Sequence, residues 1–181
     1  MSSPRPQILD TCVLINLLAS GEINEILRAA AQDSLISSAV EVESIYLRTD
    51  NPEAPMEQID LRPLIDSGLL TVCHIEGDEE AEMYVDFAGA LDDGEAMSLA
   101  IALLRDYVLA TDERKARRLF LEAAGDKARL ASTSQLVRRW AETEGVVADR
   151  LKTVLLEIER RARYRPPTTD ENYEWWVEAC K

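Results

Sequence analysis

Short apolar runs alternate with longer amphipathic segments along the chain. Each run is bounded by polar or turn residues, which is the pattern of a buried strand. The longer segments repeat apolar residues every three or four positions, as at Ala96, Leu99, Ala100 and Leu103, and so predict helices with one buried face. Strands that alternate with helices in this way predict an α/β fold built on a mostly parallel sheet.

This pattern places the expected strands and helices along the chain. We expect strands at residues 7–9, 35–37, 69–75, 107–111 and 130–131. We expect helices at residues 13–18, 23–31, 38–49, 59–66, 78–91, 96–103, 113–124, 134–143, 148–162 and 170–179. Pro166 and Pro167 break the chain before the last helix. These breaks predict a main domain of residues 1–165 and a helical extension of residues 166–181, which packs on the domain or on a partner.

Composition narrows the class of protein. A chain of 181 residues with 46% hydrophobic residues can bury the core of a single domain. No apolar run approaches the roughly 20 residues that span a bilayer, and no signal peptide is evident. Cys12, Cys73 and Cys180 are odd in number and widely spaced, so they predict neither a disulfide framework nor a zinc site. We expect a cytoplasmic protein without a membrane anchor.

Acidic residues are concentrated in the first part of the chain. The net charge is −14, and residues 1–100 carry 20 of the 34 acidic residues but only 4 of the 20 Lys and Arg. This balance argues against a general nucleic-acid binder. Most acids in such a run belong to a solvated surface, so the informative acids are those whose position has another reason.

Some polar residues have a structural explanation in the sequence itself. Ser38 and Glu41 fit a capping box at the start of a helix, and Asp92 or Asp93 fits the N-cap of another. The single histidine, His74, has no second His or Cys near it in the sequence. A half-buried strand position therefore explains His74 better than a metal or catalytic role.

Asp10 and Asp112 occupy the same position relative to a strand, since each closely follows an apolar run. The carboxyl ends of parallel strands share one edge of a sheet, which is where α/β proteins bind ligands. Asp10 is therefore either a cap of the helix that follows or one wall of a site. Glu43 and Glu95 lie in the first turns of helices that enter from that edge, although each also fits an exposed helical residue.

Four carboxylates at one edge predict a site for a hard metal ion. They would raise one another's pKa values, and a divalent cation relieves that repulsion. Oxygen ligands without His or Cys select Mg²⁺ or Mn²⁺. Such an ion lowers the pKa of an attacking water and stabilises charge on a phosphodiester, which is nuclease chemistry that needs no histidine base. The chain has no glycine-rich phosphate loop, which argues against nucleotide cofactors that depend on one.

Four segments of the chain resemble the PIN-domain ribonucleases, and the resemblance covers nearly the whole length. They are ILDTCVLINLL at residues 8–18, AVEVE at 39–43, LDDGEAMSLAIAL at 91–103 and LATDERKARRL at 109–119. The Gly-Glu-Ala and Thr-Asp-Glu forms are most similar to an uncharacterised, toxin-like prokaryotic branch of the family. Four such segments in order, with α/β spacing between them, make the resemblance fairly specific.

The resemblance implies roles for individual residues. The four family acids, implied to be catalytic, match Asp10, Glu43, Glu95 and Asp112, of which Asp10, Glu95 and Asp112 are implied to hold the metal. Supporting roles are implied for Thr11, Asp93 and Glu113. The cations that follow Asp112 are candidates to contact RNA phosphates, or else form a solvated helix face. These cations are Arg114, Lys115, Arg117 and Arg118.

The family's fold and activity follow from the same resemblance as expectations. The fold is an α/β/α sandwich with a short, mostly parallel sheet of four to five strands. Family members cut single-stranded RNA with Mg²⁺ or Mn²⁺, many are toxins held by an antitoxin, and many form homodimers. This chain departs from a compact toxin by its segment from Arg165 onward, and it is more acidic than an RNA-binding surface should be.

Two other functions compete with the ribonuclease. The overall acidity is compatible with a PIN-like fold kept as a binding or scaffolding module, with weak or no catalysis. A phosphatase of the strand-end Asp type is a weaker alternative. That chemistry uses a second Asp two residues after the first, and this chain has Cys12 there.

Overall fold

Two compact units make up the protein in a computed structural model that describes residues 5–30 and 32–181. The sheet unit comprises Met1–Val13, Ala31–Glu43 and Leu61–Ser132. The helical unit comprises Leu14–Ala30, Ser44–Asp60 and Thr133–Lys181. Each unit is therefore assembled from three separate stretches of chain. Helix α1 (Thr11–Ala19) begins in the sheet unit and continues in the helical unit.

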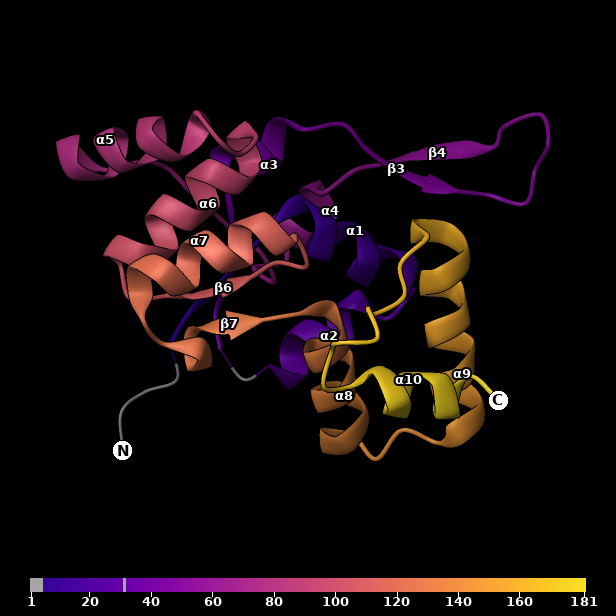
Figure 1. Ribbon diagram of the computed structural model, residues 1–181. Coiled ribbons are helices and arrows are strands. Elements are labelled where there is room, and N and C mark those ends of the chain that lie inside the picture. Colours follow the sequence, from indigo (N-terminus) through magenta and orange to yellow (C-terminus); the bar gives the residue numbers. More distant parts are fainter. Residues whose placement is uncertain (1–4, 31) are drawn as a thin grey trace. The chain divides into compact units, whose positions relative to one another are not determined.

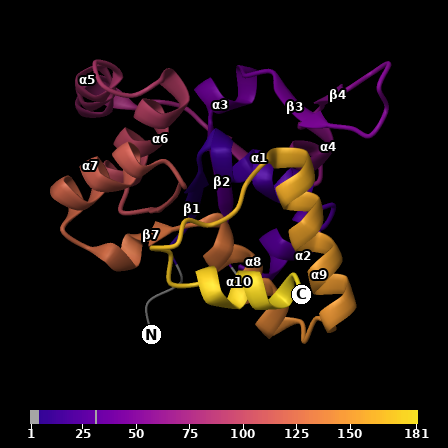
Figure 2. The same cartoon turned by 45° about the vertical axis from the view of Figure 1, so that its right-hand side comes forward.

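The sheet unit is built on a five-stranded sheet. Figure 1 labels its strands β6 and β7, and Figure 2 labels β1, β2 and β7. The order of the sheet is β5-β2-β1-β6-β7, so the first strand of the chain lies in the middle. Every neighbouring pair in that order is parallel. The strands are β1 (Gln7–Leu9), β2 (Ser34–Ser37), β5 (Thr71–Cys73), β6 (Val108–Ala110) and β7 (Leu130–Ala131). The parallel sheet with its flanking helices confirms the predicted α/β, PIN-like fold.

Helix α6 packs directly on the sheet, against β1, β2 and β6. Helices α3, α5 and α7 in turn pack against α6, and Figures 1 and 2 both show α5, α6 and α7 side by side. Ala96, Ala100 and Ala102 are fully buried on α6, and their small side chains let the helix approach the strands closely. The helices of this unit are α3 (Ser38–Val42), α4 (Arg62–Asp66), α5 (Gly77–Ala88), α6 (Asp93–Leu104), α7 (Arg114–Ala124) and the 3₁₀ turn η1 (Lys127–Arg129).

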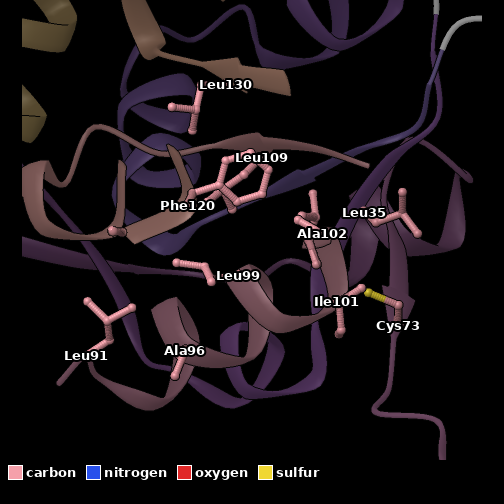
Figure 3. Close-up of a cluster of buried hydrophobic side chains, with 12 residues drawn as sticks. Leu35, Cys73, Leu91, Ala96, Leu99, Ile101, Ala102, Leu109, Phe120 and Leu130 are labelled. Carbon is pink, nitrogen blue, oxygen red and sulfur yellow. The ribbon is translucent and has the colours of Figure 1, made fainter. Parts of the chain in front are cut away.

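A cluster of buried apolar side chains holds α6 and α7 to the sheet (Figure 3). Leu109 of β6, Leu99 of α6 and Phe120 of α7 are each almost entirely inaccessible to solvent. The guanidinium of Arg129 covers the Phe120 ring at 5.2 Å from its centroid. Truncating a buried Phe to Ala typically costs about 3–5 kcal/mol. Phe120 is therefore a main anchor of α7, the helix that follows Asp112.

A buried ion pair fixes α5 to the end of α6. The Arg105 guanidinium donates to the Glu80 carboxylate at 2.7 and 2.8 Å and to the carbonyl oxygen of His74 at 2.7 Å. These hydrogen bonds hold the pKa of Glu80 below its usual value. Glu80, one of the nine acidic residues between Glu76 and Glu95, therefore has a structural role.

The helical unit combines helices with a two-stranded antiparallel hairpin. Its helices α2 and α8 pack together, as do α9 and α10. The last turn of the α9 segment continues as a π-helix. Apart from α1, the elements are α2 (Ile23–Ala29), β3 (Ile45–Arg48), β4 (Met56–Ile59), α8 (Thr133–Thr143), α9 (Ala148–Glu157), the π-helix η2 (Ile158–Ala162) and α10 (Tyr173–Ala179).

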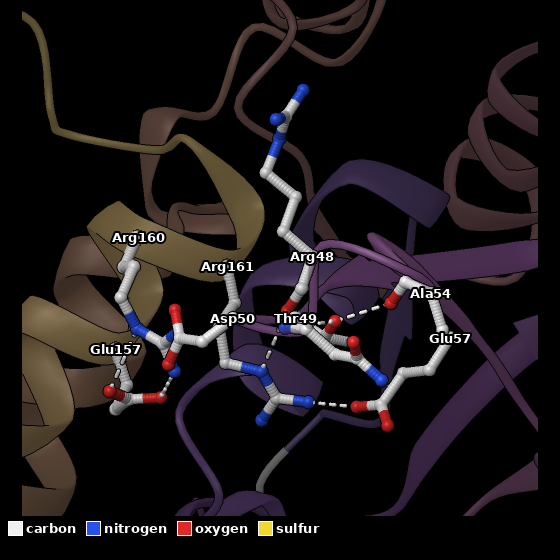
Figure 4. A network of polar contacts seen from close by, with 9 residues as sticks. Arg48, Thr49, Asp50, Ala54, Glu57, Glu157, Arg160 and Arg161 are labelled. Atoms are coloured by element: carbon white, nitrogen blue, oxygen red, sulfur yellow. Dashed lines mark hydrogen bonds and ion pairs between the residues drawn. The ribbon is translucent and has the colours of Figure 1, made fainter.

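The hairpin is fastened to η2 by salt bridges (Figure 4). Arg160 pairs with Asp50 in the hairpin loop, and Arg161 pairs with Glu57 of β4. The Arg161 guanidinium also donates to the carbonyl oxygen of Arg48 at 3.4 Å. Two of the arginines in the basic second part of the chain therefore neutralise hairpin acids.

The hairpin corrects the predicted helix at residues 38–49. Helix α3 ends at Val42 and β3 follows from Ile45. Ile45 and Leu47 are buried while Tyr46 between them is exposed, which is the period of a strand and not of a helix. The N-cap is also one residue earlier than predicted, because the Ser37 hydroxyl accepts from the Val40 N–H. The predicted capping box of Ser38 and Glu41 is therefore wrong.

Two smaller predictions are also corrected. The helix expected at 59–66 begins only at Arg62, because residues 56–59 form β4. His74 lies just beyond β5 and is exposed, so it does not occupy a half-buried strand position. Among the described residues, no helix is long and apolar enough to cross a membrane.

Candidate active site

The Asp10 carboxylate is buried at the carboxyl end of the central strand. β1 and β6 are in register with Leu9 opposite Ala110, so both strands end at the same level. Asp10 is 2% exposed. Burial raises the pKa of Asp10, and hydrogen bonds from Thr111, Cys12 and the backbone of Thr11 act in the opposite direction. Asp10 is thus a carboxylate that the fold keeps out of water, and the groups that donate to it are all uncharged.

Thr111 holds Asp10 from the neighbouring strand end. Its hydroxyl donates to Oδ2 of Asp10 at 2.7 Å and accepts from the Glu113 N–H at 3.1 Å. The Thr111 side chain is fully buried, and its backbone N–H donates to the Ala131 carbonyl at 3.1 Å. One hydroxyl therefore joins the ends of β1 and β6 and the start of α7.

Cys12 forms a second link between the two strand ends. Its thiol donates to Oδ2 of Asp10 at 3.3 Å, and its sulfur accepts from the Asp112 N–H at 3.4 Å. Burial and the neighbouring carboxylates of Asp10 and Asp112 raise the pKa of this thiol well above its usual value. Cys12 therefore stays protonated at neutral pH and can serve as a hydrogen-bond donor.

Glu43 is held near Asp10 by Thr11, the residue that follows Asp10 in the sequence. The Thr11 hydroxyl donates to Oε2 of Glu43 at 2.8 Å. Glu43 is the C-cap residue of the short helix α3, with extended backbone, and does not lie in the first turn of a longer helix. Burial raises the pKa of Glu43, and the charges of Asp92, Asp10 and Asp93 raise it further.

Gly94 makes room for Glu43 at the start of α6. A Cβ atom at Gly94 would lie 2.4 Å from Oε1 of Glu43 and 3.4 Å from Oγ1 of Thr11. The glycine of the Asp-Asp-Gly-Glu segment is therefore explained by close approach to the Thr11–Glu43 pair.

Glu95 takes part in a helix cap, which was not predicted, and it also lies among the acids of the site. Asp92 is the N-cap of α6, and Glu95 completes a capping box with it, through a bond from the Glu95 N–H to Asp92 at 2.8 Å. Glu95 also faces the acid cluster, since burial and the charges of Asp92, Asp10 and Glu113 raise its pKa to about 7. Helix capping and a place among the acids are therefore compatible.

Asp112 and the two supporting acids lie around this cluster. Asp112 is half-buried, and its backbone is held by Cys12. Glu113 is the N-cap of α7 and accepts from the Lys115 N–H at 3.2 Å. Asp93 is exposed and accepts a hydrogen bond from the Tyr84 hydroxyl at 3.0 Å. Both residues therefore have a structural role as well as a negative charge near the site.

Two of the four candidate RNA-contact residues are engaged within the protein. The Arg117 guanidinium donates to the carbonyl oxygens of Thr111 at 2.7 Å and Ala131 at 2.8 Å, and so clamps the ends of β6 and β7. The Lys115 ammonium donates to the Ala90 carbonyl. Arg114 and Arg118 are exposed.

The ligand types at this edge suit a hard divalent cation. Three carboxyls, of Asp10, Glu43 and Glu95, have raised pKa values, and for each of them charge from other acids contributes. A cation with oxygen ligands removes that repulsion. Across residues 5–30 and 32–181, no three His, Cys, Asp or Glu side chains already stand close enough to hold one ion. The chemistry of these oxygen ligands therefore fits a hard divalent cation, and the side chains would have to move closer together to bind one.

Three further residues of the site had no functional role in the sequence interpretation. Thr111 was only the last residue of a strand, Cys12 only an argument against a phosphatase, and Asp92 only a cap. The available signal was position, since Thr111 and Cys12 flank the two strand-end acids. The charge of Asp92 raises the pKa of Asp10, Glu43 and Glu95 alike, which spacing alone does not reveal.

Comparison with known families gives a match that covers most of the chain. A family model described as a PIN domain matches residues 6–172. No curated protein and no solved structure matched the chain.

Proposed function

Because the chain belongs to the PIN-domain family, whose members are usually nucleases, we propose that it is a divalent-metal-dependent endoribonuclease. Its substrate is single-stranded RNA, and its cofactor is Mg²⁺ or Mn²⁺. The proposal extends to a cytoplasmic, toxin-like protein that forms a homodimer and is held by an antitoxin. The catalytic acids are Asp10, Glu43, Glu95 and Asp112, with the metal on Asp10, Glu95 and Asp112.

One observation carries the proposal. Asp10 is buried and accepts three hydrogen bonds, none of them from a cation, while its own charge contributes to the raised pKa values of Glu43 and Glu95. Such an arrangement destabilises the metal-free fold, because each carboxylate costs desolvation without a compensating positive charge. Functional sites are where proteins keep such arrangements.

The residues divide the work of hydrolysis. Thr11, Cys12 and Thr111 fix the position of the Asp10 carboxylate, so that it needs no reorganisation when charge arrives. When bound, the ion supplies an activated water and positive charge beside the phosphodiester. Glu95, whose pKa is raised to about 7 in the absence of an ion, would give up its proton as a cation binds and would hold that cation as a carboxylate.

Calorimetric titration with Mn²⁺, paired with a cleavage assay on single-stranded RNA in the same buffer, tests the proposal. We expect the wild-type protein to bind Mn²⁺ and to cut RNA, and Asp10→Asn and Asp112→Asn to lose both. Asp10→Asn changes a buried residue and can unfold the protein. Glu95→Gln changes a less buried residue, so a loss of binding and cleavage in this variant can be measured on folded protein. Asp66→Asn removes one exposed acid of α4 in the same unit and should leave binding and cleavage intact.

Metal-dependent cleavage that survives both aspartate substitutions would show that the active site has been misassigned. If the wild-type protein binds Mn²⁺ but cleaves no RNA, the proposed enzymatic activity is contradicted.

A binding or scaffolding module is the second candidate, and one observation favours it. The described acids do not stand preassembled around a single ion position. That function predicts a protein that neither binds Mn²⁺ nor cuts RNA, and that binds a protein partner equally well in EDTA.

A further inference from the structure

An open hollow of about 490 Å³ follows helix α7 in the sheet unit. It is lined by Arg114, Arg117, Arg118, Leu121 and Glu122. The spacing i, i+3, i+4 and i+7 puts the three arginines and Leu121 on one face of the helix. This face begins two residues after Asp112, one of the proposed catalytic acids.

The charge of this face is the opposite of what helix stability favours. The start of a helix prefers acids because the macrodipole is positive there. Helix α5 follows that rule, with Asp78, Glu79 and Glu80 in its first turn. Helix α7 has an acid only at its N-cap, Glu113, and its first turn begins with Arg114 and Lys115. In a chain of net charge −14, this group of exposed cations is a surface that can attract an external anion.

The contacts show which cations are available to a ligand. Within the part of the chain that the structure describes, the Arg114 guanidinium has no hydrogen bond or ion pair. Arg118 meets only Glu122, at 3.8 Å, and both side chains are more than 60% exposed. Such an exposed surface pair contributes little, so an incoming phosphate can replace it. Arg117, by contrast, is committed to the carbonyl oxygens of Thr111 and Ala131.

We infer that the α7 face binds the phosphodiester backbone of single-stranded RNA, with Arg114 and Arg118 each contacting a phosphate. The two residues lie one turn apart, about 6 Å along the helix axis, so one extended strand can reach both. Leu121, 36% exposed, gives the strand an apolar contact on the same face. Arg117 positions the end of β6 and contributes long-range charge. This inference rests on the proposed function and names the surface that holds its substrate.

A second hollow, of about 470 Å³, does not show the same features. It lies in the helical unit and is lined by Arg138 and Arg139 together with Glu142 and Glu171. Arg138 is already held by Glu142 at 2.7 Å and by Asn172 at 2.9 Å. Its two arginines face two acids, so it offers a polyanion no net attraction.

The test is RNA binding by fluorescence anisotropy, measured in EDTA so that no cleavage occurs, across a range of salt concentrations. The labelled probe is a single-stranded RNA of about 15 nucleotides, long enough to cross the face. We expect the double variant Arg114→Ala/Arg118→Ala to bind about tenfold more weakly at low salt. The slope of log K against log salt should fall by about 1.4, because each contact to a single strand contributes about 0.7.

The control variant is Arg28→Ala/Arg139→Ala, which changes the net charge by the same amount. Both of these arginines are exposed, and within the described residues neither has a polar partner. The control should reproduce the wild-type slope. Equal weakening by both double variants would mean general charge attraction, and would overturn the inference. Displacement of the RNA by poly-glutamate as readily as by unlabelled RNA would assign the face to an acidic protein segment and would also overturn it.

Failure of this inference is distinguishable from failure of the proposed function. If the Arg114/Arg118 variant binds RNA like the wild type while Asp10→Asn abolishes cleavage, the nuclease stands and the α7 face is wrong. If the wild-type protein neither binds nor cuts RNA under any metal condition, the proposed function itself fails.

Discussion

The sulfur of Cys12 accepts a hydrogen bond from the backbone N–H of Asp112 at 3.4 Å. The same thiol donates to Asp10, so one side chain sets the spacing of two acids from different strands. Cys12→Ala removes both contacts, and we expect RNA cleavage to fall about 10- to 100-fold, because a small misplacement of catalytic groups is costly. Cys12→Ser keeps a donor and an acceptor and should restore most of the activity. Mn²⁺ affinity, measured separately, should follow the same order, which a purely structural role for Cys12 would not produce.

The hydroxyl of Thr111 is expected to matter for stability as well as for activity. Thr111→Val preserves the shape of the side chain but leaves the buried Asp10 carboxylate and the Glu113 N–H each without one partner. We expect a loss of about 1–3 kcal/mol in the free energy of unfolding, measured in urea. Thr111→Ser should lose much less. Equal stability of the Val and Ser variants would show that the hydroxyl does not support Asp10.

Gly94→Ala should separate activity from stability. The new Cβ would meet Oε1 of Glu43 at 2.4 Å, and the end of an exposed Glu side chain can move away. The new Cβ would also lie 3.3 Å from Cγ2 of the buried Val40. This tight contact offsets the helix propensity of Ala, which exceeds that of Gly by about 1 kcal/mol, so the melting temperature should change little. Cleavage should nevertheless fall, because Glu43 leaves Thr11. Gly89→Ala is the matched control, since its Cβ would meet only the Asp86 carbonyl at 3.7 Å.

The protonation of Glu95 predicts a dependence of stability on pH. Its pKa is raised from 4.5 to about 7 in the folded protein, so the unfolded chain releases this proton first as the pH rises. The contribution of Glu95 to stability therefore declines between about pH 4.5 and pH 7 in EDTA, and stays low above pH 7. Urea unfolding of Glu95→Gln should show a shallower decline than the wild type over that window. Mn²⁺ affinity of the wild type should increase as Glu95 loses its proton, up to about pH 7.

The ion pair of Glu80 and Arg105 predicts the opposite dependence on pH. The pKa of Glu80 is lowered, so its contribution is complete above the unfolded value near 4.5 and disappears as the pH falls through the lower, folded pKa. At pH 7, Glu80→Gln should cost about 3 kcal/mol in unfolding free energy, because it breaks a largely buried pair. Glu79→Gln, next to it and exposed, should cost little. Cleavage per folded molecule should not change in either variant.

Strand-end acids were the part of the site that the sequence could predict. A buried apolar strand followed by Asp forces the carboxylate to the edge of a parallel sheet, wherever the other elements lie. The prediction for Asp10 and Asp112 therefore needed only the strands, and the structure places both residues there. The assignment of their catalytic and metal-binding roles stays a prediction.

The position of Glu43 depended on information that local spacing does not hold. We predicted that it lay within a helix, but the helix ends at Val42 and Glu43 is held by Thr11. The hairpin that follows is stabilised by Arg160 and Arg161, more than a hundred residues away in the sequence. Because tertiary contacts of that range decide the local structure, the helical pattern of residues 38–49 was misleading.

The central place of β1 in the sheet has a consequence during synthesis. β1 is made first, yet its neighbour β6 lies about a hundred residues later, so an incomplete chain exposes one unpaired edge of β1. Pairing over such sequence distance is slow, and an unpaired edge invites association with other chains. The Asp10 carboxylate likewise meets Thr111 only after β6 has left the ribosome. In a nascent chain, Asp10 is therefore present long before Thr111 can hold it in the position that the proposed activity needs.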